Sequence, residues 1–158
     1  MASLALTTLT ESVRAHTYAR PPGSPPDLAQ LRAQYDGLGG MLPLAPGTTR
    51  TPVVADGVPC EWIVPEQANP RPAILYLHGG YYALGSLASH RPLCSHLAAA
   101  SGVAVLNVGY RLAPEHPYPA ALDDVARVYR WLIDGGRAPE RLAIAGDSAG
   151  GGLTLGTL

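Results

Sequence analysis

The sequence predicts an α/β protein with a mostly parallel β-sheet that has helices on both faces. Three apolar runs, each long enough for a buried strand, alternate with helical stretches; they are residues 73–77, 103–108 and 141–145. Alternation of this kind is typical of β-α-β units with right-handed crossovers. The runs are almost continuously apolar, as expected of strands that are covered on both sides. We therefore expect these strands to lie parallel in one sheet.

Helices are expected between these strands, near residues 89–100 and 119–133, and a further helix follows the last strand. Earlier in the chain, residues 53–54 and 60–64 are expected to form two strands. An Asp-Gly pair at 56–57 lies between them, and this pair favours a tight hairpin turn.

Two more helices are expected near the N-terminus, over residues 4–18 and 26–35. A proline followed by Asp27 supplies a start for the second helix, and Gly37 supplies a stop. The segment between the two helices, residues 21–26, is rich in proline and is expected to be a linker.

The motif GDSAGG at residues 146–151 is the most informative feature of the chain. A serine on a tight turn between a strand and a helix has an exposed hydroxyl and lies beside the N–H groups of the helix N-terminus. Glycines on both sides relieve the strain of such a turn. The bare pattern has little weight in a chain with 18 glycines among 158 residues. Its position after a strand and before a helix indicates that Ser148 is a candidate nucleophile.

Two further segments combine a strand with a distinctive loop. Residues 73–86 run from a strand into the loop HGGY, and residues 103–121 run from a strand into YRLAPEHPYPA. With GDSAGG, and in this order, they resemble the hormone-sensitive lipase-like branch of the α/β-hydrolases. That family carries an HGGG loop, a YRLAPEHPFPA-like stretch and a GDSAGG elbow. The resemblance extends from about Ile63 to the end of the chain.

The resemblance implies an α/β-hydrolase fold with a cap-like helical segment at residues 1–45 and an incomplete hydrolase domain at 46–158. In this family the catalytic acid and base follow the serine, in the order Ser, Asp, His, whereas this chain ends at Leu158. We therefore expect a fold truncated after the nucleophile elbow. A second chain or a missing C-terminal half would supply the two groups, and a homo-oligomer is also open. The last strand would otherwise leave an apolar edge, which folded proteins avoid.

The resemblance also assigns roles at the site. It makes Ser148 the nucleophile, gives the oxyanion hole to Gly79, Gly80, Tyr81 and Ala149, and gives structural support to His78 and Asp147. The loops should meet because open α/β sheets place their sites at the carboxyl ends of the strands. A base role for His78 is the less favoured alternative. A catalytic role for Asp147 is disfavoured because adjacent side chains in an elbow point apart.

Tyr81 departs from the family, since it stands where the third glycine of HGGG belongs. If this position requires a positive φ, a tyrosine costs about 1–2 kcal/mol there. If it does not, the N–H group still donates and the ring narrows the acyl pocket.

The other histidines and two further aspartates have ordinary explanations. We expect His116 to be a structural hydrogen-bonding group, and His16, His90 and His96 to be surface residues of helices. The pair Asp123 and Asp124 lies at the start of the 119–133 helix, where the helix dipole favours acidic side chains.

The composition excludes several classes of function. A net charge of −1 and scattered arginines give no reason to expect a nucleic acid or an anionic membrane as a partner. Cys60 and Cys94 are isolated, so neither a disulfide framework nor a zinc site is indicated, and no cofactor or metal is expected. The first residues make a poor signal peptide, and no stretch reaches the ~20 apolar residues of a membrane span. We therefore expect a soluble cytoplasmic protein.

The resemblance implies two alternative functions. The first is a serine-dependent hydrolase of carboxylic esters, with short or medium acyl chains as the family implies, which forms an acyl-enzyme on Ser148. The isolated chain is expected to be inactive, because a serine nucleophile needs a base and a group that orients the base. The alternative is a non-catalytic, receptor-like module that binds a small ligand on the same scaffold.

Overall fold

The computed structural model describes residues 27–158. The expected helix over residues 4–18 and the linker at 21–26 lie outside the described residues. The described elements, in chain order, are α2 (Leu28–Gly40), β1 (Thr48–Ala55), β2 (Val58–Pro65), β3 (Asn69–Leu77), α3 (Leu87–Ser101), β4 (Val103–Val108), α4 (Ala120–Asp134), a 3-10 turn (Pro139–Arg141), β5 (Leu142–Gly146) and α5 (Ala149–Thr157).

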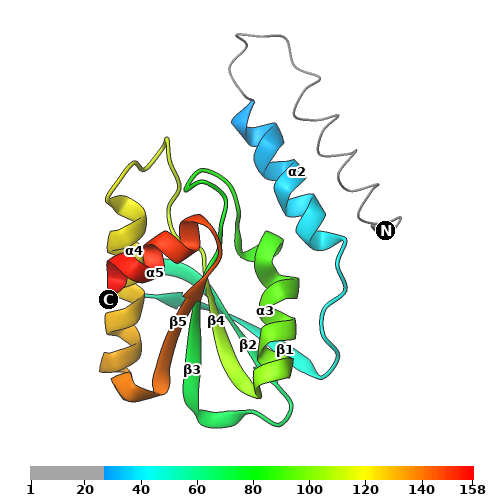
Figure 1. Cartoon of the computed structure of the whole chain (residues 1–158), viewed down its shortest axis with the longest axis vertical. Coiled ribbons are helices and arrows are strands. Elements are labelled where there is room, and N and C mark those ends of the chain that lie inside the picture. Colours follow the sequence, from blue (N-terminus) through cyan, green and yellow to red (C-terminus); the bar gives the residue numbers. More distant parts are fainter. Residues whose placement is uncertain (1–26) are drawn as a thin grey trace, which may run out of the picture.

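The strands form one mixed sheet in the order β1-β2-β4-β3-β5 (Figure 1). Strands β4, β3 and β5, which correspond to the three apolar runs, are parallel to one another. Strands β1 and β2 extend the sheet in antiparallel fashion. The predicted parallel arrangement is therefore confirmed for the three runs, and the predicted hairpin accounts for the antiparallel side.

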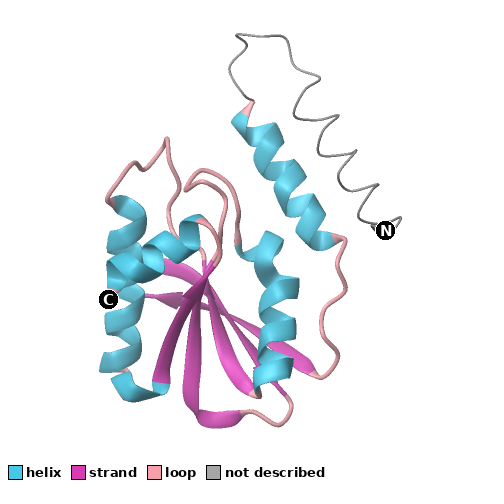
Figure 2. Ribbon diagram, in the orientation of Figure 1, coloured by secondary structure: helices cyan, strands magenta, loops and turns pink. Residues whose placement is uncertain are grey.

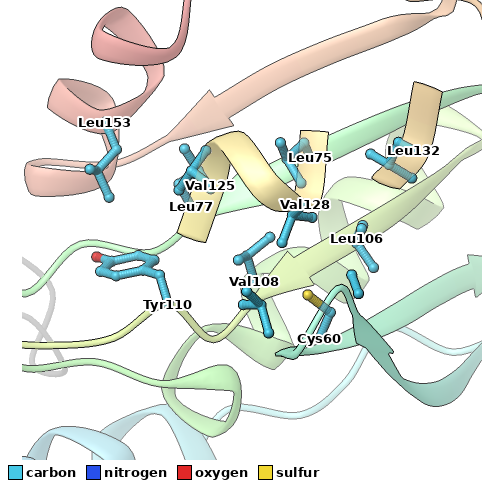
Figure 3. Close-up of a cluster of buried hydrophobic side chains, with 12 residues drawn as sticks. Cys60, Leu75, Leu77, Leu106, Val108, Tyr110, Val125, Val128, Leu132 and Leu153 are labelled. Atoms are coloured by element: carbon cyan, nitrogen blue, oxygen red, sulfur yellow. The ribbon is translucent and has the colours of Figure 1, made fainter. Parts of the chain in front are cut away.

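Helices cover both faces of the sheet (Figure 2). On one face, side chains of α4 and α5 pack against the central strands in a cluster that includes Leu75, Leu106, Val128 and Leu153 (Figure 3). On the other face, α3 contributes a smaller cluster around Cys94. Burying each of the larger apolar side chains contributes about 1.5–3 kcal/mol. The predicted α/β-hydrolase fold, with helices on both faces, is confirmed in these residues.

The hairpin turns at Asp56 and Gly57, whose φ angles are 45° and 82°. Positive φ at both central residues is the requirement of the tight turn that matches the twist of two antiparallel strands. Asp-Gly pairs meet this requirement with little strain, so the predicted hairpin is confirmed.

Helix α2 begins where the sequence predicts and ends later. The Asp27 carboxylate accepts a hydrogen bond from the Gln30 N–H at 3.1 Å, which caps the first turn. The predicted stop at Gly37 is wrong, because the helix continues to Gly40. The reason is tertiary packing: Gly39 is buried against α3, and an added Cβ would lie 2.2 Å from the Ser89 carbonyl oxygen. The proposed division into a cap-like segment at 1–45 and a hydrolase segment at 46–158 stays a prediction.

Candidate active site

The turn between β5 and α5 has the geometry of a strained elbow. Ser148 is exposed, has φ 50° and ψ −115°, and stands at the N-cap position of α5. A non-glycine residue in this region of backbone space is strained and needs support from its surroundings. The support comes from close packing. A Cβ on Gly150 would lie 1.9 Å from the Leu77 carbonyl oxygen, and one on Gly146 would lie 2.5 Å from Gly150.

The loop that follows β3, residues 78–86, lies beside this elbow and is called the oxyanion loop below. Strands β3 and β5 are neighbours in the sheet, with Leu77 opposite Gly146. The Gly79 N–H donates a hydrogen bond to Asp147 Oδ1 at 2.9 Å. The expectation that the two loops meet at the carboxyl ends of their strands therefore holds.

The Asp147 side chain is directed to β3 and α3. In addition to the bond from Gly79, its Oδ1 accepts a hydrogen bond from the Tyr76 hydroxyl at 3.0 Å. The Nε2 atom of His90 lies 3.3 Å from the same oxygen. One carboxylate oxygen thus joins the oxyanion loop, the sheet and α3 to the residue next to Ser148.

His78 is buried at the base of the oxyanion loop, with 1% of its surface exposed. Its Nδ1 lies 2.8 Å from the Gly79 carbonyl oxygen, which can only accept, so the contact requires the proton on Nδ1. The ring stacks on Tyr110 at a centroid distance of 4.2 Å. Burial lowers the pKa of the His78 imidazole from 6.5 to about 4. A neutral, buried ring in these contacts braces the loop.

The expectation that His90 is a surface residue is wrong. It is 7% exposed, and its ring centroid lies 5.4 Å from that of His78. Its Nδ1 contacts the Ser89 hydroxyl at 2.8 Å, and its Nε2 faces Asp147. Helix α3 packs against the sheet at this point, and polar partners on both ring nitrogens make burial of the histidine tolerable. His96, in contrast, is exposed as expected.

Three of the four residues predicted to form the oxyanion hole have N–H groups available. Within residues 27–158, no acceptor is found for the N–H groups of Gly80, Tyr81 and Ala149. Gly79 is the exception, because its N–H is bonded to Asp147. This bond removes Gly79 from the predicted set of donors. Ala149 begins α5, where the helix dipole favours a negative charge.

The backbone of Tyr81, which stands in place of a glycine, adopts a positive φ. Its φ is 57°, and that of Tyr82 is 59°, so two consecutive tyrosines have left-handed backbone. Each is expected to cost about 1–2 kcal/mol relative to glycine. Tyr81 is 82% exposed. The Tyr82 hydroxyl lies against α5, where a Cβ added to Gly152 would be 2.5 Å from it.

An open cavity of about 560 Å³ adjoins the oxyanion loop. Its lining comes from this loop, the 111–122 segment and α5, and consists of Tyr81, Tyr82, Arg111, Ala113, His116, Tyr118, Pro119, Ala121, Leu122, Gly152, Leu153 and Gly156. Gly152 lies one helical turn after Ser148, since its N–H bonds to the Ser148 carbonyl oxygen. The cavity therefore reaches α5 one turn from the candidate nucleophile, and Ser148 itself is not in its lining.

Asp124 has a role that its sequence position did not reveal. It is buried and accepts hydrogen bonds from the N–H and the guanidinium of Arg111, at distances of 2.8–3.0 Å. It thus fixes the start of the segment that lines the cavity. Asp123, its neighbour, is exposed in the first turn of α4, as expected.

A base for Ser148 is not found in the described part of the chain. Within residues 27–158, no histidine is hydrogen bonded to the Ser148 hydroxyl, which also makes no capping bond to α5. His78 and His90 are engaged in the contacts above, and His96 Nε2 contacts the Pro43 carbonyl oxygen. His116, the fourth described histidine, is exposed and lines the cavity, and its ring is not hydrogen bonded to Ser148. No group of acidic, histidine and cysteine side chains suited to a metal ion is found among these residues. None of their helices is long and apolar enough to cross a membrane.

A serine in a strained strand-to-helix turn, beside a loop with free N–H groups, is the arrangement of an α/β-hydrolase. The chain belongs to the α/β-hydrolase fold family, because the family model described as "alpha/beta hydrolase fold" matches residues 74–158. The resemblance to the hormone-sensitive lipase-like branch is confirmed by a solved esterase of the bacterial hormone-sensitive lipase family. That structure is 39% identical, has a TM-score of 0.86, and matches 100% of this chain and 52% of its own.

Two curated relatives carry names that state a reaction. A protein of Streptomyces hygroscopicus named acetyl-hydrolase is 46% identical over 119 residues, which are 75% of this chain and 38% of that protein. A Pseudomonas putida protein named ethyl acetate hydrolase is 52% identical over 85 residues, 51% of this chain and 27% of that protein. The chain thus spans about half the length of the solved esterase and less than half the length of these two curated relatives.

Proposed function

We propose that the protein is a carboxylic-ester hydrolase that forms an acyl-enzyme on Ser148. The observation that carries this proposal is the left-handed backbone of Ser148 at the N-terminus of α5, beside the unpartnered N–H groups of Gly80 and Tyr81. In this arrangement a serine hydroxyl and the donors for an oxyanion lie on adjacent turns. The names of the relatives, an acetyl-hydrolase and an ethyl acetate hydrolase, support esters with a short acyl group as the substrate class.

The reaction would proceed in two steps. Ser148 Oγ attacks the acyl carbon, the C–O bond to the alcohol breaks, and the alcohol leaves with a proton. Water then attacks the acyl-enzyme and releases the acid and the free serine. The N–H groups of Gly80, Tyr81 and Ala149 would stabilise the negative oxygen in both steps, and losing one such donor typically lowers turnover by about 10²–10³-fold.

We propose further that the general base and the acid that orients it lie outside these 158 residues, on a further segment or on a second chain. The support is the environment of the described histidines. His78 has a pKa lowered to about 4 and faces a carbonyl oxygen, and His90 faces Asp147. His96 contacts the Pro43 carbonyl oxygen, and His116 lines the cavity without a hydrogen bond to Ser148. The 158-residue chain alone should then show negligible turnover.

The test compares the natural protein, with any partner that copurifies, and the 158-residue chain. Hydrolysis of p-nitrophenyl acetate and labelling by a fluorophosphonate are measured for each, and for the Ser148→Ala and Ser101→Ala variants of the natural protein. Ser101 lies at the far end of α3 and serves as the control. We expect Ser148→Ala to lose more than about 10⁴-fold in turnover and all labelling, and Ser101→Ala to lose neither.

Turnover that persists in Ser148→Ala would overturn the assignment of Ser148 as the nucleophile. Steady turnover by the 158-residue chain that depends on Ser148 would overturn only the proposal that the base lies outside this chain. Binding of the ester by the natural protein without any turnover would favour the ligand-binding alternative.

A further inference from the structure

Arg32, on α2, is hydrogen bonded to two loops that are distant from it in sequence. Its Nε donates to the Ala83 carbonyl oxygen at 2.8 Å, and its Nη2 donates to the Ala113 carbonyl oxygen at 2.9 Å. Its Nη1 and Nη2 also donate to the two carboxylate oxygens of Glu115, both at 2.7 Å. A planar guanidinium can satisfy such a set of acceptors at once, whereas a lysine ammonium cannot reproduce the fork.

The Ala83 contact leads directly into the oxyanion loop. The Ala83 N–H donates to the Gly80 carbonyl oxygen at 3.0 Å and so closes the turn that contains Tyr81. The Tyr82 carbonyl oxygen, in the same turn, accepts from the Ala113 N–H at 2.8 Å. Arg32, Ala83 and Ala113 are thus linked in a ring of hydrogen bonds around this turn. Fixing the ring fixes the direction of the Tyr81 N–H.

Helix α2 also contacts the end of the same loop. The Ser86 hydroxyl donates to Asp36 Oδ1 at 2.7 Å, and Ser86 caps α3. Both contacts come from one helix, one turn apart, so α2 spans the loop from its tight turn to its end. Of the two contacts, the one from Arg32 reaches the turn itself.

Arg32 and Glu115 are both charged over the pH range in which enzymes work. Hydrogen bonds from Arg32 lower the pKa of the Glu115 carboxyl to about 2. An exposed ion pair of this kind contributes little to stability. The ion pair can nevertheless orient the loop, because a bidentate pair holds the guanidinium in one plane.

We propose that Arg32 is a positioning residue that holds the oxyanion loop in the conformation needed for catalysis, acting through Ala83 and Ala113. This inference rests on the function proposed above and adds α2 to the elements that build the site. It assigns to a helix far from Ser148 in sequence the task of orienting the Tyr81 N–H. The backbone of Tyr81 is strained, so it does not hold this orientation by its own preference.

The test uses the Arg32→Lys and Arg32→Ala variants of the natural protein, with Arg137→Lys as the matched control. Arg137 also donates to backbone carbonyl oxygens, those of Pro70 and Arg71, but at the amino end of β3, opposite the site. For each variant, kcat and KM are measured per active site titrated with a fluorophosphonate. Inhibition by a trifluoromethyl ketone, which mimics the tetrahedral adduct, is measured in parallel.

We expect Arg32→Lys to lower kcat by about 10–100-fold, to change KM by less than about threefold, and to weaken the trifluoromethyl ketone by a factor similar to that in kcat. Arg137→Lys should change none of the three. A residue with only a structural role would lower the fraction of titratable sites and leave kcat per site unchanged, and that result would overturn the proposal. Arg32→Lys retains the charge and serves if Arg32→Ala fails to fold.

Amide hydrogen exchange at Ala83 and Ala113 separates this proposal from the proposed function, because both N–H groups are hydrogen bonded within the ring that Arg32 joins. If the unaltered protein lacks turnover that depends on Ser148, the proposed function fails. Faster exchange at these two amides in Arg32→Lys, with unchanged exchange in α4, would still support the positioning of the loop by Arg32. Unchanged exchange at Ala83 and Ala113 would overturn it whatever the enzyme assay shows.

Discussion

The turns after β3 and after β5 both place non-glycine residues in left-handed backbone, and they are held in different ways. In the elbow, Ser148 has φ 50° between glycines whose surroundings leave no room for a side chain. In the oxyanion loop, Tyr81 and Tyr82 have φ angles of 57° and 59°, and the loop is bonded to side chains from other elements, among them Arg32.

The difference shows where each conformation is encoded. The elbow depends on the absence of side chains at Gly146 and Gly150, since a Cβ at either would lie within 2.5 Å of backbone atoms. The oxyanion loop also has crowded glycines, at 79, 80 and 85, but it depends in addition on hydrogen bonds from residues far along the chain. Small local changes should therefore disrupt the elbow severely, whereas the loop should respond to changes in its partners and in pH.

The largest effect is expected from Gly150→Ala, with Gly151→Ala as the matched control. The added methyl at Gly150 would lie 1.9 Å from the Leu77 carbonyl oxygen, whereas at Gly151 the nearest atom is 3.6 Å away. Both substitutions are made in the first turn of α5. We expect Gly150→Ala to lower the free energy of unfolding by about 3 kcal/mol or more, and Gly151→Ala to change it by less than about 1 kcal/mol. Urea unfolding measures both, and equal effects would contradict the packing account of the elbow.

The contrast between the turns also explains what could be predicted from the sequence. The three parallel strands were predictable because their apolar runs are uninterrupted, and β4, which is buried along almost its whole length, occupies the predicted residues 103–108. The elbow was predictable because its glycines and serine are adjacent in the chain. These signals are local, and the structure reproduces them.

Features that depend on distant contacts were not predictable. Arg32 bonds to residues 51 and 83 positions away, and no local pattern marks it among the other arginines. His90 is buried beside His78 and Asp147, which lie in the turns after β3 and β5. Gly37 failed as a helix stop because Gly39 packs against α3. In each case a tertiary contact outweighs the local preference.

A smaller effect on stability is expected when the pH is lowered, because His78 at the base of the oxyanion loop then takes up a proton. Burial lowers its pKa to about 4, below the 6.5 of the unfolded chain, so the unfolded state takes up the proton first as the pH falls. This contribution to stability is complete above about pH 6.5 and is lost as the pH falls toward 4. Between pH 7 and pH 5 we expect the free energy of unfolding to fall by about 2 kcal/mol through this group.

The control for this prediction compares two histidines. His78→Asn removes the titrating group and retains a donor for the Gly79 carbonyl oxygen, so the fall in stability from pH 7 to pH 5 should shrink. His96→Asn replaces an exposed histidine and should leave the fall unchanged. A pH dependence of unfolding that is the same in His78→Asn as in the unaltered protein would show that His78 does not titrate as its burial implies.

The smallest effect is expected from relieving the strain in the oxyanion loop itself. Tyr81→Gly removes the penalty of left-handed backbone, which stabilises the folded protein by about 1–2 kcal/mol. The greater conformational freedom of glycine in the unfolded chain offsets about 0.5–1 kcal/mol of this gain. Since Tyr81 is 82% exposed, little packing is lost, and we expect a net stabilisation of about 0.5–1 kcal/mol.

Tyr82→Gly separates strain from packing, because it relieves a φ of almost the same size. The Tyr82 side chain is 42% exposed, and its hydroxyl lies against Gly152 of α5. The loss of these contacts should cancel the gain, so Tyr82→Gly is expected to be neutral or destabilising in the same urea unfolding experiment. If both variants were destabilised equally, the backbone of the loop would owe its conformation to the tyrosine side chains, and the bonds from Arg32 and Asp147 would not be what holds it.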